Sequence, residues 1–295
     1  MLVGIIANIT KENVFEVVST LTNELKANGL DYLLTKTLLE DEKKIKIELD
    51  EDFLSDDSEI YEKSDMIISI GGDGTMLSTA YHAQLHDKPV IGLNLGKLGF
   101  LAEADISQID EIINDIKNGN YKIQKRMVLT AECDTYPQEK LYAINDIVID
   151  KGGWPKMIEL TAWVDGEYVT TFNADGVIIA TPIGSTGYSL STGGPVVSPS
   201  AGAITLCPIS PHSLTMRPLI LSSDQEITIK ADSPHDEIQV SCDGQRVYHL
   251  PPPLEVKLKK SNKPLKLVHT SLTTYFETLR NKLLWGIDIR NKPGR

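Results

Sequence analysis

The feature that most constrains the fold is a change in hydrophobic period after Lys122 of this 295-residue chain. Before it, apolar runs alternate with helical patterns: LVGIIAN is followed by a helical period and a Gly stop, and DMIISI by MLSTAYHAQL and then VIGLNL. Strands that alternate with helices predict a parallel sheet with helices on its faces. After Lys122 come many short alternating segments, such as MVLTAEC, YAINDIVID and IELTAWVDG. These are typical of an all-β architecture.

The change of period divides the chain into two predicted domains. We expect an α/β domain with a parallel, Rossmann-like sheet over residues 1–122 and an all-β domain over residues 123–271. The last segment, SLTTYFETLRNKLLWG, returns to a helical period. A C-terminal helix within residues 272–295 is therefore expected to pack back on the first domain and complete it. An acid-rich stretch over residues 40–59 has no steady period and predicts a solvated loop with at most one short strand.

Charge and composition exclude several classes of partner. The net charge of −12 opposes nonspecific attraction to nucleic acid and to anionic membranes. The N-terminal apolar run is too short to span a bilayer and has neither a basic leader nor a cleavage site, so we expect a cytoplasmic protein. The three cysteines, Cys133, Cys207 and Cys242, have no paired spacing and are expected to be reduced core thiols.

The segment GGDGT over residues 71–75 follows a buried strand and opens a helix. Ligands of open α/β sheets bind at this end of the strands, and glycines such as Gly72 and Gly74 let backbone N–H groups approach phosphate oxygens at a helix N-terminus. Asp73 does not suit a phosphate binder, because a carboxylate repels phosphate unless a metal intervenes or a proton must be taken. The alternative is that Asp73 only caps the helix.

A second group of polar residues begins at Asp175 and continues through TPIGSTGYSLSTGGP. Its small hydroxyl and glycine residues offer hydrogen bonds to ribose and base edges, and Tyr188 could stack on a base. The alternative is a Ser/Gly-rich surface loop. A serine-hydrolase role for Ser185 is not supported, because the chain has no G-x-S-x-G elbow there. Asn145 and Asp146 interrupt a strand, which indicates either a site or a bulge.

Together these segments resemble the NAD kinase family, and they occur in the order of that family. The resemblance covers nearly the whole chain and is carried by GGDGTML, GLNLGKLGFLAE, IND, DGVIIATPIGSTGYSLSTGGP, PISPHSLTMRPLIL, CDGQ and LRNKLLWG. GGDGT alone also resembles diacylglycerol-type lipid kinases and phosphofructokinases, whereas the segments around Ser185 and His212 do not. Asp146, Ile183 and Gly187 stand where Glu, Thr and Ala are common, which bears on substrate preference.

The resemblance implies transfer of a phosphoryl group from ATP to the adenosine 2′-hydroxyl of NAD, with NAD bound in the cleft between the two domains. It assigns Asp73 to the reacting ribose, as the candidate catalytic residue. Further contacts with the substrates are assigned to Gly72, Gly74, Asn145, Asp146, Lys156, Asn173, Asp175, Thr186, Gly187, Tyr188, Ser189, Ser191 and Gln245. No dedicated metal site is expected, because Mg²⁺ or Mn²⁺ would arrive with the triphosphate. A homodimer or homotetramer through the β domain is also implied.

Two other functions remain open from the sequence. One is a kinase of another hydroxyl compound, such as a lipid or a sugar, against which the acidic charge and the TPIGSTGYS segment argue. The other is a noncatalytic NAD(P)-binding regulator that keeps the fold, against which the intact Asp73 argues.

Overall fold

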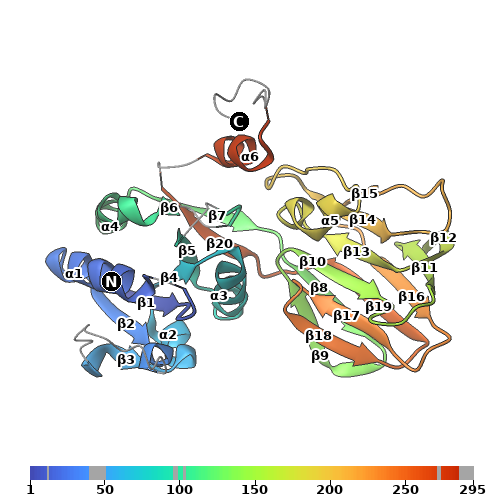
Figure 1. Ribbon diagram of the computed structural model, residues 1–295, viewed down its shortest axis with the longest axis horizontal. Coiled ribbons are helices and arrows are strands. Elements are labelled where there is room, and N and C mark those ends of the chain that lie inside the picture. Colours follow the sequence, from blue (N-terminus) through green and yellow to red (C-terminus); the bar gives the residue numbers. More distant parts are fainter. Residues whose placement is uncertain (12, 40–50, 96–98, 102–103, 271–273, 286–295) are drawn as a thin grey trace, which may run out of the picture. The chain divides into compact units, whose positions relative to one another are not determined.

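The computed structural model describes residues 1–11, 13–39, 51–95, 99–101, 104–270 and 274–285. It divides the chain into two compact units (Figure 1). Unit 1 comprises Met1–Gln124 and Lys266–Arg295, and unit 2 comprises Lys125–Leu265. Unit 1 is an α/β unit with a parallel sheet and unit 2 is an antiparallel β unit, so the predicted fold class is confirmed.

Unit 1 is built on an eight-stranded sheet in the order β3-β2-β1-β4-β5-β20-β7, with β6 paired to β5. Its strands are β1 Leu2–Ala7, β2 Asp31–Thr35, β3 Leu54–Ser55, β4 Met66–Gly71, β5 Pro89–Asn94, β6 Ala104–Asp105, β7 Lys122–Arg126 and β20 Leu265–His269. Its helices are α1 Val14–Ala27, α2 Asp57–Lys63, α3 Asp73–Leu85, α4 Ile109–Asn118 and α6 Tyr275–Leu283, with 3-10 turns at Lys36–Leu39, Glu51–Phe53 and Ile106–Gln108.

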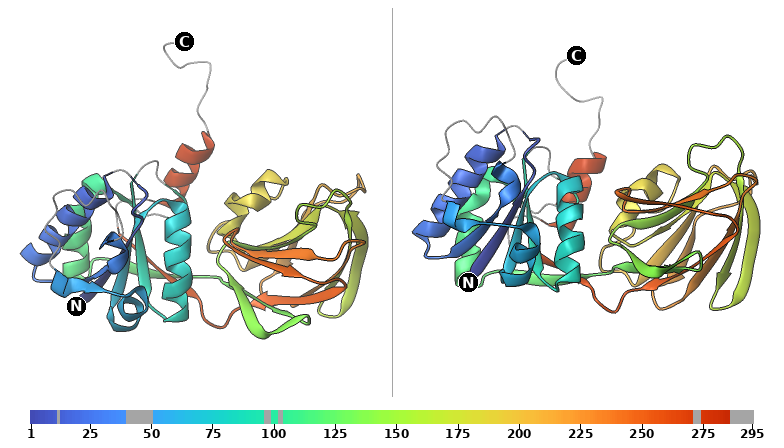
Figure 2. Two further views of the ribbon diagram at one scale, coloured as in Figure 1. Left: turned by 60° about the horizontal axis from the view of Figure 1, so that its bottom comes forward. Right: turned by 90° about the horizontal axis from the view of Figure 1, so that it is seen from below.

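Side chains along β1 and β4 alternate between the two faces of this sheet, and both faces are buried. Ile5 and Ile68 belong to a core cluster that also contains residues of α1 and α4. The opposite face meets α2 and α3: a Cβ on Gly4 would lie 2.5 Å from Ile60, and Ser69 hydrogen-bonds Thr79 at 2.9 Å. Helices therefore cover the sheet on both sides, as Figure 2 shows.

Unit 2 consists of two six-stranded antiparallel sheets, β15-β14-β13-β10-β17-β18 and β12-β11-β16-β19-β8-β9. The strands are β8 Leu129–Cys133, β9 Tyr136–Ala143, β10 Asp146–Asp150, β11 Ile158–Val164, β12 Glu167–Ala174, β13 Gly176–Ala180, β14 Ala203–Ile209, β15 Leu219–Ser222, β16 Ile227–Asp232, β17 Ile238–Cys242, β18 Arg246–Leu250 and β19 Leu254–Lys260. A 3-10 turn, η4 Gly184–Thr186, and a short helix, α5 Tyr188–Ser191, follow β13.

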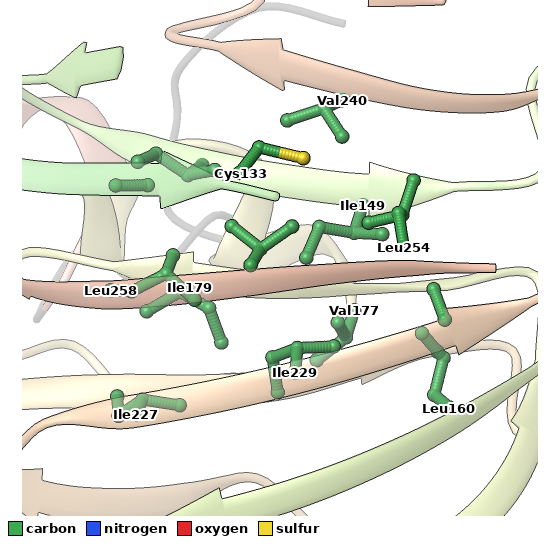
Figure 3. Close-up of a cluster of buried hydrophobic side chains, with 14 of the residues drawn as sticks. Cys133, Ile149, Leu160, Val177, Ile179, Ile227, Ile229, Val240, Leu254 and Leu258 are labelled. Atoms are coloured by element: carbon green, nitrogen blue, oxygen red, sulfur yellow. The ribbon is translucent and has the colours of Figure 1, made fainter. Parts of the chain in front are cut away.

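Inward-facing side chains of both sheets form one hydrophobic core, in which Ile149, Val177 and Ile179 meet Leu160 and Ile229 (Figure 3). The intervening residues of β13 and β10 point to the outer face of their sheet. There Ile178 forms a second, smaller cluster with residues of β10 and β14. Because α5 contacts β13, this outer face is partly covered. All five residues of β13 are buried.

Two features differ from the sequence-based expectations, and a third agrees with them. The division falls after Gln124 and after Leu265, not after residues 122 and 271, because β20 pairs in parallel with β5 and so belongs to the sheet of unit 1. The acid-rich stretch contains the short strand β3 and ends in the first turn of helix α2, which was not expected and whose Ile60 is fully buried, while residues 40–50 lie outside the described residues. As expected, the C-terminal helix α6 belongs to unit 1, where Lys282 Nζ lies 5.9 Å from the centroid of the Phe100 ring.

Candidate functional site

In unit 1, the GGDGT segment forms the turn from β4 into α3. Gly71 ends β4 and Asp73 begins α3, at the carboxyl end of the parallel sheet. A Cβ on Gly71 would lie 2.4 Å from Thr75 Oγ1, so this position requires glycine. Thr75 Oγ1 in turn accepts a hydrogen bond from Asn8 Nδ2 at 3.0 Å. This hydrogen bond connects the GGDGT segment to the residue that follows β1. Gly72 and Gly74 lie at the N-terminus of α3, where the backbone N–H groups favour the binding of anions.

The Asp73 carboxylate does not cap α3. The N-cap residue is Gly72, and no side-chain cap bond is present at this helix. Instead Asp73 Oδ2 and Oδ1 accept hydrogen bonds from the backbone N–H groups of Phe100 and Leu101, at 3.1 and 3.4 Å. A Cβ on Gly99 would lie 1.5 Å from Asp73 Oδ1, so only glycine allows this approach. The carboxylate is half-buried and held in one orientation by the backbone.

In unit 2, strand pairing brings three distant segments of sequence together at the start of β10. Asp146 pairs with Ala180 at the end of β13, and Ile147 pairs with Cys242 at the end of β17. Antiparallel pairing therefore places the residues before β10 beside the residues that follow β13 and β17. Asn145 and Asp146 thus lie between the TPIGSTGYS segment and Asp243. Figure 1 labels β10, β13 and β17, the three strands that bring these segments together.

The first half of the TPIGSTGYS segment packs tightly against Asn145. Asn145 O accepts a hydrogen bond from Thr181 N at 2.8 Å, and a Cβ on Gly184 would lie only 2.0 Å from the same oxygen. Residues 181–185 are buried, whereas Gly187 and Tyr188 are exposed. A Cβ on Gly187 would lie 3.9 Å from both Asn145 Nδ2 and Asp146 Oδ2. The structure therefore gathers Asn145, Asp146 and Gly187.

Asp146 is a buried acid, with 5% of its surface exposed. Burial, with a further contribution from the Asp243 carboxylate, raises the pKa of Asp146 to about 7. Perturbed carboxylic acids of this kind are common at functional sites, although structural networks produce them too.

Tyr188 lies near the acids of the outer face of this sheet. The residue is 48% exposed, and its pKa is raised by burial and by the charges of Asp150, Asp175 and Asp146. Asp175 forms an ion pair with Lys151, with 2.7 Å between Lys151 Nζ and Asp175 Oδ1. An exposed aromatic ring beside carboxylates that can accept hydroxyl hydrogens suits a nucleoside.

The remaining predicted residues have different surroundings. Ser189 is fully buried and its hydroxyl lies 3.1 Å from Cys207 Sγ, so its side chain holds α5 against β14 and cannot reach a ligand in this arrangement. Thr186 is half-buried and its hydroxyl bonds Ile183 O at 3.1 Å. Four other predicted residues have exposed side chains: Lys156, Asn173, Ser191 and Gln245.

Sequence reasoning missed the residues that support Asn145 and Asp146. Asp243 accepts hydrogen bonds from the backbone N–H groups of Ile144 and Asn145 at 2.9 and 2.7 Å. The Asp-Gly pair at residues 243–244 looks like an ordinary hairpin turn in sequence, and both residues have positive φ. The only local signal was its place within the CDGQ segment. The partners of Asp73, Phe100 and Leu101, donate through their backbone and leave no signal in their side chains.

Comparison with known proteins finds relatives that match both units of the chain. A model of the ATP-NAD kinase N-terminal domain matches residues 3–121, and a model of the ATP-NAD kinase C-terminal domain matches residues 144–270. The NAD kinase of Chlorobium phaeobacteroides (strain BS1) is 39% identical over 295 residues, covering 99% of each chain. The NAD kinase of Thermoanaerobacter sp. (strain X514) is 38% identical over 283 residues, covering 95% of this chain and 98% of its own.

Two solved structures have the same fold. Yeast NADH kinase complexed with NADH gives a TM-score of 0.86 at 25% identity and covers 99% of this chain and 89% of its own. An NAD kinase from Archaeoglobus fulgidus in complex with ATP gives a TM-score of 0.74 at 26% identity, covering 96% of this chain and 99% of its own. With both domain models matched and relatives near 40% identity over the full length, the chain belongs to the ATP-NAD kinase family.

Proposed function

We propose that this protein is an NAD kinase, which transfers the γ-phosphoryl group of ATP to the 2′-hydroxyl of the adenosine moiety of NAD and releases NADP and ADP. The observation that carries the proposal is the match to an NAD kinase over 99% of both chains at 39% identity. The described geometry agrees with it chemically. An anion-binding turn with a fixed carboxylate lies in unit 1, and polar groups suited to a nucleoside lie in unit 2.

In the proposed reaction, the 2′-oxygen of NAD attacks the γ-phosphorus of ATP, and the bond from that phosphorus to the bridging oxygen of ADP breaks. The 2′-hydroxyl proton passes to the Asp73 carboxylate, which acts as general base. The backbone N–H groups that bind Asp73 fix its orientation for this step. Gly72 and Gly74 would contribute backbone contacts to phosphate. Phosphoryl transfer depends mainly on positioning and charge, so these roles are sufficient.

For NAD binding we assign ribose hydroxyl contacts to Asn145 and Asp146 and base stacking to Tyr188. Asp175, Thr186, Gly187 and Ser191 lie on the segments that follow β12 and β13 and are proposed to contact the nucleosides through hydroxyl, carboxylate or backbone groups. The exposed residues Lys156, Asn173 and Gln245 are proposed as outer contacts of the dinucleotide. Ser189 is left out of this set, because its hydroxyl is directed to Cys207.

A divalent cation, Mg²⁺ or Mn²⁺, is proposed to arrive bound to ATP and to neutralise its phosphate charge. The residues that the structure describes contain no group of three or more His, Cys, Asp or Glu side chains able to hold a metal ion. His82 and His86, which have the spacing of a zinc pair, stack on the Tyr61 ring with centroids 5.4 and 5.8 Å away. Mg²⁺ usually keeps several waters and binds substrate phosphates, so the proposed cation would need few ligands from the protein.

The cell compartment and the assembly state are also proposals. The described part of the chain holds no helix of the length and apolarity that a membrane span requires. Cys133, Cys207 and Cys242 are free and buried, which supports a reducing compartment such as the cytoplasm. Strand β15 is at an edge of its sheet, and its residues Leu219 and Ile220 are 37% and 54% exposed, which supports a homo-oligomer through unit 2.

The proposal is tested with the purified protein, ATP and Mg²⁺ against a panel of acceptors: NAD, NADH, a diacylglycerol and a hexose. NADP formation is followed with an NADP-specific dehydrogenase, and ADP release is measured for every acceptor. We expect ADP release that depends on the dinucleotide. ADP release with the lipid or the sugar alone would favour the other kinase class. NAD binding without ADP release would favour a noncatalytic regulator.

A further inference from the structure

The carboxylate of Asp243 is a buried anion that the proposed reaction does not use. Its side chain has 0% exposure. It accepts hydrogen bonds from the backbone N–H groups of Ile144 at 2.9 Å, Asn145 at 2.7 Å and Asp146 at 3.4 Å. The Arg246 guanidinium completes the set, with Nη2 2.8 Å from Asp243 Oδ2. One carboxylate thus binds the backbone N–H groups of three successive residues, the two that precede β10 and the first residue of that strand.

Thr181 binds the backbone carbonyl groups of the same segment. The Thr181 hydroxyl donates to Ile144 O at 2.6 Å, and the Thr181 N–H donates to Asn145 O at 2.8 Å. Arg246 adds a third attachment, since its Nη2 also donates to Tyr142 O at 2.8 Å. The backbone of residues 142–146 is therefore fixed through its own polar groups on both sides.

The Asn145 side chain, by contrast, is not fixed through its amide oxygen. Asn145 Oδ1 is buried and has no hydrogen-bond partner among the residues that the structure describes. A buried polar atom without a partner costs free energy unless something binds it, and it is common at functional sites. The direction in which the Asn145 side chain points is consequently set by the backbone, and the backbone is set by Asp243, Arg246 and Thr181.

We propose that Asp243, oriented by Arg246, is a positioning residue for the dinucleotide: it holds the Ile144–Asp146 backbone so that Asn145 and Asp146 present their side chains to ribose hydroxyls. This inference rests on the proposed role of Asn145 and Asp146. It predicts that Asp243 acts on the binding of NAD and not on the binding of ATP or on the transfer step.

Asp243→Asn is the sharpest variant, because it keeps the size of the side chain and removes one acceptor. The amide NH₂ would face either the backbone donors or Arg246, so at least one of the charge-assisted bonds is lost. We expect the Kd and KM for NAD to rise roughly 10- to 100-fold, which corresponds to one or two such bonds. The KM for ATP should stay as in the wild type, and kcat at saturating NAD should change by less than about threefold.

Asp165→Asn is the matched control. Asp165 also has positive φ, 51° against 58° for Asp243, and its carboxylate also accepts from a backbone N–H, that of Glu226 at 2.9 Å. It lies in the turn between β11 and β12, away from Asn145. Asp165 is exposed, so Asp165→Asn controls for the loss of a backbone acceptor in a turn and should leave the NAD constants unchanged. The effect of Asp243→Asn on stability is measured separately, by its urea unfolding.

Arg246→Lys provides a second route in case Asp243→Asn does not fold. Arg246 Nη2 donates both bonds, and lysine keeps the charge but carries its ammonium on a shorter, flexible chain without the rigid guanidinium plane, so a smaller rise in the NAD Kd is expected. Folding is checked by circular dichroism and urea unfolding, and Kd by calorimetry, which needs no turnover. A folded Asp243→Asn with the wild-type Kd for NAD overturns the inference. So does an unfolded Asp243→Asn together with an unchanged Kd in Arg246→Lys, which would assign Asp243 to stability alone. Failure of the proposed function is distinguished in the wild type, which would then bind no NAD or make no NADP.

Discussion

Asp73 is the residue on which the proposed chemistry depends, and its surroundings separate two roles. It is the first residue of α3, yet it makes no cap bond and instead accepts N–H groups from Phe100 and Leu101. We predict that Asp73→Asn lowers kcat at least about a hundredfold, since a general base contributes about 10² to 10⁴ and an amide cannot take a proton. The Kd for NAD should change little. Turnover in a coupled NADP assay and calorimetry provide the two measurements.

Asp57→Asn is the control for Asp73→Asn. Asp57 is likewise the first residue of a helix in unit 1, and its Oδ1 accepts an internal hydrogen bond, from the Thr35 hydroxyl at 2.6 Å. The Asp57→Asn variant should lose a comparable free energy of unfolding and keep the wild-type turnover. If Asp73→Asn turned over at nearly the wild-type rate, Asp73 would be only an anchor for residues 100 and 101. A loss of about tenfold would indicate positioning of the hydroxyl without proton transfer.

Asp146 predicts a pH dependence of stability. Burial, with the neighbouring Asp243, raises its pKa from 3.8 to about 7, so the folded protein holds a proton that the unfolded chain has already lost. The contribution of Asp146 to stability is therefore complete below about pH 4 and disappears as the pH rises to about 7. Asp146→Asn should remove this decline. Urea unfolding should show that the free energy of unfolding of the variant, relative to that of the wild type, is higher at pH 8 than at pH 5. An equal difference at the two pH values would contradict the raised pKa.

At the scale of elements, the segment from Thr181 to Ser191 is where sequence reasoning and structure differ most. Its glycines and serines are also typical of an exposed surface loop, in which a side chain at residue 184 would be tolerated by the fold. The structure buries Gly184 against Asn145 O, with 2.0 Å left for a Cβ. Gly187, in the same segment, would place a Cβ 3.2 Å from its nearest neighbour, Gly184 O.

This difference gives a paired prediction. Gly184→Ala should lower the free energy of unfolding by about 1–3 kcal/mol, the usual cost of overpacking, and raise the KM for NAD because Asn145 must move. Gly187→Ala should be tolerated within about 1 kcal/mol, since a shift of a few tenths of an ångström relieves its contact. Urea denaturation and NAD kinetics of the two variants provide the comparison. Equal stability of Gly184→Ala and the wild type would contradict the packing described here.

Elements with a strong local pattern could be predicted from the sequence. Strands β1, β4 and β5 and helices α1 and α3 follow from continuous apolar runs and from helical spacing. Helix α2 could not, because only one side of a short helix is buried and its acidic residues mask that pattern. Strand β20 could not be assigned to the first sheet, because its LKLVH sequence resembles the preceding strands and only its pairing with β5 decides its unit.

At the scale of the whole molecule, unit 1 depends on both ends of the described chain and unit 2 does not. Leu267 and Val268 of β20 are 6% and 2% exposed within unit 1. We predict that residues 125–265 alone unfold cooperatively in urea, because they contain both sheets and their core. Residues 1–124 alone should not unfold cooperatively. They should do so when residues 266–295 are joined to them by a short Gly/Ser linker. Cooperative unfolding of residues 1–124 without β20 would show that this strand is dispensable.

The site shows the same limit of sequence reasoning on a larger scale. Single motifs were enough to nominate Asp73, Asn145 and Asp146 as candidates, because unusual residue types stand next to strand ends. Their supports are contacts between distant residues: Asp243 bonds Ile144 across a separation of 99 residues, and Phe100 bonds Asp73 across 27. Such pairs depend on the strand order, and no local pattern encodes that order.

We propose that the phosphoryl group is placed on the adenosine 2′-hydroxyl of NAD, and the position of the phosphate in the product decides whether this is so. NAD is incubated with the protein, ATP and Mg²⁺, and the product is isolated and assigned by ³¹P and ¹H NMR. In parallel, an NAD analogue without that hydroxyl is tested for binding and for ADP release. We predict a single product with phosphate at the adenosine 2′-carbon, and an analogue that binds and accepts no phosphate. Phosphate at another hydroxyl, or phosphorylation of the analogue, would contradict the account.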